Sequence, residues 1–136
     1  MIETIEVKNK THLGTHLLCE YYECDANRID NMDLISDALL EAAKRCKVTI
    51  LEKSFHKFSP QGVSGVVVIA ESHISIHTWP EHNYAAVDFF TCSEVCDTEL
   101  IIDYLKNIFG SKRCESNKIM RGKINEYNGI ARLYLI

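Results

Sequence analysis

The stretch that decides the fold is "AESHISIHTWPEHNYAAVDFFTC", Ala70–Cys92. Its "ISIHTW" segment alternates apolar with polar residues, and its "NYAAVDFFTC" segment is rich in β-branched and aromatic residues. Both patterns are typical of β-strands, and Pro80 ends the first run because proline cannot donate to a strand ladder. The same stretch holds three histidines, two glutamates and a cysteine. It therefore predicts two strands that carry side chains able to move protons.

Further strands are predicted on both sides of this stretch. "SGVVVIA" (Ser64–Ala70) is a continuous β-branched run of the kind that forms buried strands, and "SPQG" (Ser59–Gly62) before it is a turn. "KVTILEKSFHKF" (Lys47–Phe58) and "THLLCEYYEC" (Thr15–Cys24) also predict strands. The tail "ARLYLI" (131–136) predicts a last one.

Two segments have the pattern of helices. "NMDLISDALLEAAKRC" (Asn31–Cys46) repeats its apolar residues at helical spacing, and either Asp30 or Asn31 can cap its start. Lysine and arginine near its end suit the helix dipole. "CDTELIIDYLKNIFG" (Cys96–Gly110) has acids in its first turn and a glycine that can cap its end.

The order of these elements predicts the architecture. The strands that follow the first helix are joined by links too short for parallel crossovers, so the sheet is expected to be mostly antiparallel. The sequence therefore predicts an α+β fold, a two-layer sandwich with helices on one face of the sheet, formed by residues 1–136 as a single domain. A second copy of the chain is the simplest cover for the other face, so we expect a homodimer.

Composition excludes several classes of function. The net charge is −4, so nothing indicates binding to nucleic acid or to an anionic membrane. No apolar run approaches the roughly 20 residues that a membrane span needs. The N-terminus "MIETIEVKNK" lacks the apolar core of a signal peptide. We therefore expect a cytoplasmic protein whose six cysteines are free thiols, because a reducing compartment keeps thiols unpaired. Most of them are expected to be small, buried and inert.

Metal and hydrolase chemistry are both poorly supported. His73 and His77 lie four residues apart on a predicted strand, which spans about 13 Å. Two ligands of one zinc ion lie no more than about 4 Å apart, so we expect no metal. Nothing resembles the GxSxG elbow of hydrolases, and Ser72 lies between two β-runs. From the residues alone, a satisfied polar group at a strand end is the more common role for Ser72, and a catalytic role is the alternative.

The segment "ESHISIHTWPEHNYAAVDFFTC" resembles the prokaryotic S-adenosylmethionine decarboxylases, the small pyruvoyl-dependent kind. The resemblance extends through "FHKFSPQGVSGVVVIAESH" and "LGTHLLCEYYECD" and covers about residues 12 to 110. Ala70 departs from the family, whose members often have serine there, but the reactive pair beside it is intact.

The resemblance implies a self-processing enzyme. The chain would be cut between Glu71 and Ser72, which makes residues 1–71 the β chain and residues 72–136 the α chain. Ser72 would become a covalent pyruvoyl cofactor, with His77 as the acid and base of processing and Ser64 as its helper. A serine is a weak nucleophile that needs such a base within hydrogen-bond reach.

The resemblance also implies the reaction of the mature enzyme. S-adenosylmethionine would lose CO₂ and become the aminopropyl donor for spermidine synthesis, with the pyruvoyl ketone taking the place that pyridoxal phosphate has in other decarboxylases. Cys92 would return a proton to the product, a role that suits a thiol at neutral pH. A buried cysteine at a strand end is the structural alternative for this residue.

Four residues are candidates for binding the substrate. Phe58 and Trp79 could stack on the adenine ring, Glu81 could accept hydrogen bonds from the ribose, and Glu20 could face the sulfonium charge. Core packing is the alternative for the two aromatic residues, and a solvated surface position is the alternative for the two acids.

Two other functions fit the same chemistry. Some proteins of this fold decarboxylate arginine or ornithine with the same processing serine, histidine and cysteine, so the pyruvoyl machinery does not by itself define the substrate. An inactive relative that only binds a partner is a second alternative. Intact Ser72, His77 and Cys92 argue against it.

Overall fold

The computed structural model of the chain describes residues 12–70, 72–92 and 96–124. It contains an antiparallel sheet of six strands in the order β2-β3-β4-β5-β1-β6. Along the chain the elements are β1 (His12–Tyr22), α1 (Ala26–Ile29), α2 (Met32–Arg45), β2 (Ile50–Lys57), β3 (Val63–Ile69), β4 (Ser72–Trp79), η1 (Pro80–His82), β5 (Tyr84–Thr91), α3 (Thr98–Phe109) and β6 (Arg113–Lys123).

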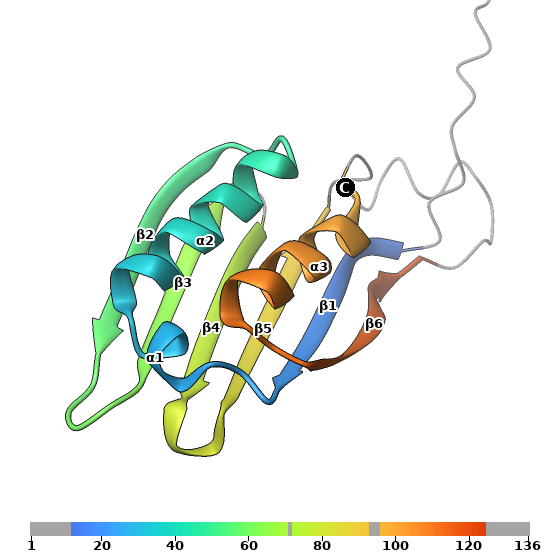
Figure 1. Cartoon of the computed structure of the whole chain (residues 1–136). Coiled ribbons are helices and arrows are strands. Elements are labelled where there is room, and N and C mark those ends of the chain that lie inside the picture. Colours follow the sequence, from blue (N-terminus) through green and yellow to red (C-terminus); the bar gives the residue numbers. More distant parts are fainter. Residues whose placement is uncertain (1–11, 71, 93–95, 125–136) are drawn as a thin grey trace, which may run out of the picture.

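Both long helices cover the same face of the sheet (Figure 1). Helix α2 lies over β2 and β3, and α3 packs against β1. This arrangement confirms the predicted two-layer α+β fold with helices on one face. We call the face turned away from α2 and α3 the open face.

The helices begin and end where local signals place them. The side chain of Asn31 accepts a hydrogen bond from Leu34 N at 3.1 Å and caps α2, and the side chain of Asp97 caps α3. Gly110 ends α3 with φ of 61°, a left-handed conformation that glycine adopts without a steric penalty. Each helix then buries one apolar stripe against the sheet; the fully or nearly fully buried members are Ile35, Leu39, Ala42, Ile101, Leu105 and Phe109.

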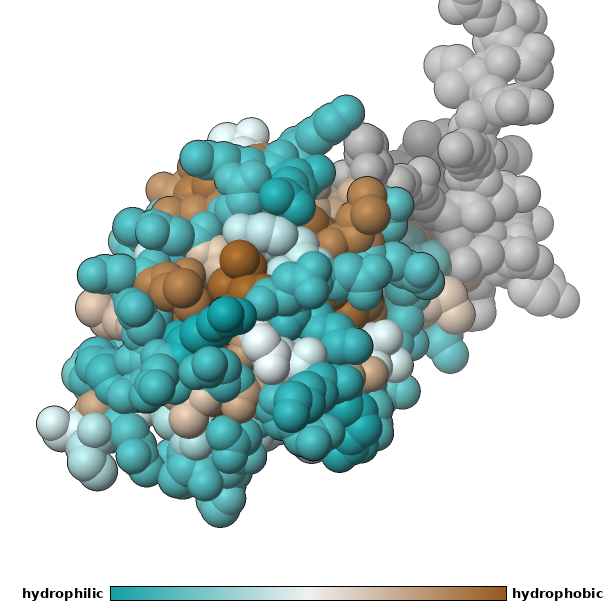
Figure 2. Space-filling model, in the orientation of Figure 1, coloured by the Kyte–Doolittle hydropathy of each residue, from teal (hydrophilic) through white to brown (hydrophobic). Residues whose placement is uncertain are grey.

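The alternation of β4 divides its side chains between the two faces. Ile74, Ile76 and Thr78 are buried beneath the helices. Full burial of such an aliphatic side chain is worth about 1.5–3 kcal/mol. His77 and Trp79 point to the open face instead, where both are exposed. Figure 2, which views the helical side, shows mostly hydrophilic residues with scattered hydrophobic ones.

The C-terminal part of the sheet differs from the prediction. Strand β6 pairs with β1 along its length, yet nothing in its sequence predicted it. It is an edge strand whose residues are almost all exposed, so the apolar alternation that marks a buried strand is missing. The predicted strand 131–136 lies outside the described residues. The short helix α1 was also not expected.

The prediction that all cysteines are free thiols is wrong for one pair. The structure joins Cys46, at the end of α2, to Cys96, just before α3, in a disulfide. Fifty positions separate these residues, so their spacing gave no signal. Cys19, Cys24 and Cys114 remain thiols. Among the described residues, no helix is long and apolar enough to cross a membrane.

Candidate active site

Ser72 begins β4 at the tip of a tight hairpin. Ile69 at the end of β3 pairs with Ser72, so only Ala70 and Glu71 connect the two strands. Glu71, the predicted residue before the cut, lies outside the described residues. The pairing of β3 with β4 continues from Ile69 and Ser72 to Ser64 and His77. A cut before Ser72 would therefore open a loop and leave the strand pairing of the sheet in place.

The structure brings Ser72 and Cys92 together, although they are twenty positions apart in the sequence. Strands β4 and β5 are antiparallel neighbours, so the start of β4 lies beside the end of β5. The backbone N–H of Cys92 donates to the Ser72 hydroxyl oxygen at 3.3 Å. The predicted nucleophile and the predicted proton donor thus share one end of the sheet.

A second predicted pair forms on the open face. Ser64 on β3 lies opposite His77 on β4 in the strand register. The Ser64 hydroxyl and the His77 Nδ1 atom are 2.8 Å apart, a hydrogen bond that can carry a proton in either direction depending on the tautomer. The exposed imidazole is held by a hydroxyl partner and is reachable from outside the chain.

These two pairs do not meet within one chain. Ser72 and His77 are five positions apart on the same strand, which corresponds to about 16 Å. The His77 imidazole of a chain therefore cannot reach the hydroxyl of its own Ser72.

Phe58 and Trp79 lie in one row across the open face, on either side of Gly62. Phe58 N donates to Gly62 O at 2.8 Å, and the register that pairs Ser64 with His77 places Gly62 opposite Trp79. The two aromatic side chains are 47% and 40% exposed. They are two strand spacings apart, about 9.5 Å, and the glycine between them has no side chain.

The two predicted acids are both in contact with polar neighbours. Glu81 in η1 accepts a hydrogen bond from the Gln61 amide at 2.9 Å. Glu20 on β1 accepts one from the hydroxyl of Tyr84 on β5. Each carboxylate keeps a second oxygen for a further contact.

A polar network on the open face was not predicted. Asp88 accepts hydrogen bonds from Ser75 Oγ and, at 2.7 Å, from His16 Nε2, while His73 Nε2 lies 3.6 Å from the same carboxylate. Arg121 donates to His16 Nδ1 at 3.1 Å. A guanidinium can only donate, so His16 Nδ1 is the acceptor of this contact. The His16 proton is therefore on Nε2, which donates a hydrogen bond to Asp88.

This network ties four strands together. Its histidines and aspartate lie close enough to suggest a metal site, but an ion on His16 Nε2 would displace the proton that Asp88 accepts and would oppose the donor on Nδ1. The absence of a metal remains a prediction. The members of the network are dispersed from β1 to β6, so no local motif could have identified them.

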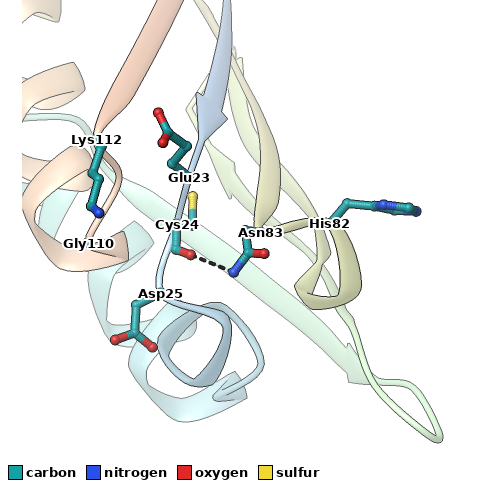
Figure 3. A pocket seen from close by; sticks show the side chains of 7 residues that line it. All are labelled: Glu23, Cys24, Asp25, His82, Asn83, Gly110 and Lys112. Carbon is teal, nitrogen blue, oxygen red and sulfur yellow. Dashed lines mark hydrogen bonds between the residues drawn. The ribbon is translucent and has the colours of Figure 1, made fainter.

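Figure 3 shows a cavity of about 530 Å³ beside η1. Because η1 follows β4 and Ser72 begins it, the cavity lies at the other end of the sheet from Ser72. Asn83 crosses it to donate to the Cys24 carbonyl at 3.0 Å. Burial raises the pKa of the Cys24 thiol to about 11, so this thiol is protonated at neutral pH and is a poor nucleophile. None of the predicted site residues lines this cavity, whose lining consists of Glu23, Cys24, Asp25, His82, Asn83, Gly110 and Lys112.

Comparison with known proteins identifies close relatives. The sequence model of the family described as S-adenosylmethionine decarboxylase matches residues 15–122. A protein of Fervidobacterium nodosum named S-adenosylmethionine decarboxylase proenzyme is 50% identical over 114 residues, which cover 84% of this chain and 83% of the relative. A protein of the same name from Acidithiobacillus ferrooxidans is 45% identical over 113 residues, or 83% and 85% of the two chains.

A solved structure agrees with these relatives. The crystal structure of the adenosylmethionine decarboxylase of Aquifex aeolicus superposes with a TM-score of 0.79 and is 36% identical in sequence. The superposition covers 88% of this chain and 99% of the other. The likeness therefore extends through the fold as well as the motifs.

Proposed function

The chain belongs to the S-adenosylmethionine decarboxylase family, and from this premise we propose that it is a self-processing, pyruvoyl-dependent decarboxylase of S-adenosylmethionine. It is a carboxy-lyase that releases CO₂ and decarboxylated S-adenosylmethionine, the aminopropyl donor for spermidine synthesis. The observation that carries the proposal is the Ser72 hydroxyl at a hairpin tip, hydrogen-bonded to the backbone of Cys92. A cytoplasmic location remains a prediction.

Processing uses the hydroxyl of Ser72 as its nucleophile. Ser72 Oγ attacks the carbonyl carbon of Glu71, and the peptide bond is replaced by an ester while the nitrogen of residue 72 gains a proton. Removal of the Ser72 α-proton then breaks the Cβ–Oγ bond and releases Glu71 as a carboxylate. Water converts the remaining dehydroalanine into a pyruvoyl group and ammonia. The names of the relatives, which call them proenzymes, support this route.

The base for these steps comes from a second copy of the chain. A chain cannot use its own His77 on Ser72, because about 16 Å of strand separates them. In a homodimer of αβ units joined through the open faces, the partner subunit's His77 acts on Ser72 and is held there by its hydrogen bond to Ser64. Exposed apolar side chains on the open face support a dimer that buries this face. They are Phe58, Val68, Trp79 and Ile119.

Mixed dimers test this shared site. Suppose that a Ser72→Ala chain and a His77→Ala chain, carrying different tags, are co-expressed. One site of the mixed dimer then has both substitutions, while the other combines an intact Ser72 with an intact His77. We expect the His77→Ala chain to be cut in mixed dimers only, as mass spectrometry of each tagged chain will report. If mixed dimers stay uncut, both residues belong to one protomer's site and the shared site is wrong.

The mature site keeps these residues around a ketone at position 72. The pyruvoyl group supplies a carbonyl that binds the substrate amine and accepts the electron pair left behind by CO₂. Cys92 lies against position 72, since its backbone N–H contacts Ser72 Oγ at 3.3 Å. Its thiol returns a proton to the substrate α-carbon as a general acid.

The slot over Gly62 supports S-adenosylmethionine as the substrate. A flat ring stacked between two others needs about 7 Å between the outer rings, and Phe58 and Trp79 are about 9.5 Å apart by strand spacing. Adenine fits this slot, with Glu81 accepting hydrogen bonds from the ribose and Glu20 facing the sulfonium. Ser72 and Trp79 lie at opposite ends of β4, so the slot of one chain serves the ketone of the partner subunit. Arginine and ornithine have no ring to place there.

Three substrates offered side by side test the assignment. We expect CO₂ release from S-adenosylmethionine and none from arginine or ornithine. Phe58→Ala should raise KM for S-adenosylmethionine by about 5- to 150-fold, the factor that stacking on a base is worth, while self-cleavage continues. Leu51→Ala, which removes an exposed apolar residue of β2, the strand that ends just before Phe58, is the control. Release of CO₂ from arginine or ornithine but not from S-adenosylmethionine would agree with the pyruvoyl mechanism and would show that the substrate assignment is wrong.

A further inference from the structure

A ladder of stacked side chains crosses the open face behind Trp79. The rings of Trp79 and Tyr84 are stacked, with centroids 5.4 Å apart, and Tyr84 is stacked on Tyr22 at the same distance. The guanidinium of Arg113 lies over the far side of Tyr22, 4.1 Å from the ring centroid. We call these four residues the aromatic ladder.

The strand register builds this ladder. Trp79 pairs with Tyr84 and Tyr22 pairs with Arg113, while the pairing of Tyr21 with Ala85 places Tyr22 opposite Tyr84. Four adjacent strands thus contribute one side chain each to a single row. Their spacing of about 4.8 Å brings flat side chains on neighbouring strands into stacking contact.

Tyr84 is the member of the ladder that is fixed most firmly. Its hydroxyl donates to the Glu20 carboxylate on β1. Burial and this hydrogen bond raise the pKa of Tyr84 well above its usual range, so the phenol remains a donor at neutral pH. Rings on both sides and a charged acceptor at its tip hold Tyr84 in one orientation.

The ladder determines which way the indole of Trp79 faces. Tyr84 covers the ring from the β5 side, so the opposite ring face is turned toward β3, where Gly62 leaves the slot open. The imidazole of His77 lies 6.3 Å from Trp79 on the same strand. Since a side chain on an open sheet face has more than one common rotamer, an unsupported indole could fall across Gly62 and close the slot.

We propose that Tyr84, anchored by Glu20 and backed by Tyr22 and Arg113, is a positioning residue that holds Trp79 upright as one wall of the substrate-ring slot. This inference rests on the proposed function, because the slot is the site assigned there to the adenine ring. It gives Tyr84 a role in substrate binding although Tyr84 itself does not touch the reacting atoms. The chemistry at Ser72 and Cys92 lies at the opposite end of β4 and β5 and does not depend on it.

The kinetic test is a KM-against-kcat comparison of processed enzymes. We expect Tyr84→Ala to raise KM for S-adenosylmethionine about 2- to 13-fold, the factor that an aromatic pair is worth, with kcat within about twofold of the parent. Tyr104→Ala is the matched control: this tyrosine also has an arginine over its ring, Arg45 at 3.9 Å, but it lies on α3 on the helical side. An unchanged KM in Tyr84→Ala would overturn the proposal.

The fluorescence of Trp79 can be measured without interference from other tryptophans, because Trp79 is the chain's single tryptophan. A hollow of about 340 Å³ beside Tyr22, Trp79, His82 and Tyr84 leaves an edge of the ladder open to small molecules. In Tyr84→Ala we expect acrylamide to quench the tryptophan fluorescence more strongly than in the parent, and adenosine to protect it less. Tyr104→Ala should behave as the parent does. Equal quenching in all three proteins would show that Tyr84 does not position the indole.

A milder pair of variants removes the risk that Tyr84→Ala fails to fold. Tyr84→Phe keeps the ring and loses the hydroxyl, and Glu20→Gln weakens the same hydrogen bond. If Tyr84 and Glu20 act through one contact, Tyr84→Phe raises KM less in a Glu20→Gln background than in the parent, whatever Glu20 also does at the sulfonium. An equal effect of Tyr84→Phe on KM in both backgrounds would show that the anchoring role is wrong. Failure of the parent to decarboxylate S-adenosylmethionine would reject the proposed function alone, because the quenching experiment still reports on Tyr84.

Discussion

Ser72→Ala is expected to remain a full-length chain with no measurable decarboxylase activity. The substitution removes the only oxygen that can attack the Glu71 carbonyl from the adjacent residue, so neither the ester nor the pyruvoyl group can form. The alanine methyl is smaller than the serine side chain, and Ser72 is only half-buried at a strand end, so the sheet should fold as before. The loss of activity is complete because the cofactor is absent, a larger effect than the removal of any single binding contact.

Intact mass and N-terminal sequencing will measure this result. The parent should give two chains, the second blocked to Edman degradation because it begins with a pyruvoyl group, while Ser72→Ala should give one. Ser75→Ala is the matched control, since Ser75 lies on the same strand and its hydroxyl donates to Asp88. It should still be cut before residue 72. Cleavage of Ser72→Ala at the same bond would show that another group is the nucleophile.

Cys92→Ala is expected to separate processing from turnover. The backbone N–H that contacts Ser72 Oγ is retained in this variant, so self-cleavage should continue. Decarboxylation should be about 10²- to 10⁴-fold slower, the usual value of a positioned general acid. Cleavage is followed on a denaturing gel and turnover by release of CO₂ under saturating substrate.

Cys114→Ala controls for the loss of a thiol elsewhere in the sheet. Cys114 on β6 pairs with Tyr21 near the end of β1, whereas Thr91, next to Cys92, pairs with Thr15 near its start, so Cys114 lies away from the reacting atoms. Its turnover should match that of the parent. A processed Cys92→Ala enzyme with undiminished turnover would mean that another group protonates the product.

The parts of the fold that were predicted correctly have local causes. The alternation in "ISIHTW" and the β-branched run in "SGVVVIA" define β4 and β3 without reference to the rest of the chain. Helix α3 begins after Asp97 and ends at Gly110 because capping depends on a few neighbouring backbone groups. Strand β6 was not predicted, because an exposed edge strand is formed by its pairing with β1 and has no apolar pattern of its own.

The candidate site was also predicted in part from the sequence and decided in part by the tertiary structure. The sequence identified Ser72, His77 and Cys92 through a long motif, and the structure brings Ser72 to Cys92 and Ser64 to His77. It also places Ser72 and His77 too far apart to act within one chain. A rise of about 3.3 Å per residue already implied that separation, but only the structure shows the uncovered sheet face on which a second copy of the chain can supply the missing histidine.

By itself, the sequence determined the strands around Ser72, the two long helices and the types of reactive side chain, because periodicity, capping and motif are properties of contiguous residues. Only the tertiary structure decided which of those side chains meet. The disulfide between Cys46 and Cys96, the network around Asp88 and the aromatic ladder from Trp79 to Arg113 all join residues far apart in the chain. Their contacts depend on strand order and register, which are set by the packing of the whole sheet against its helices.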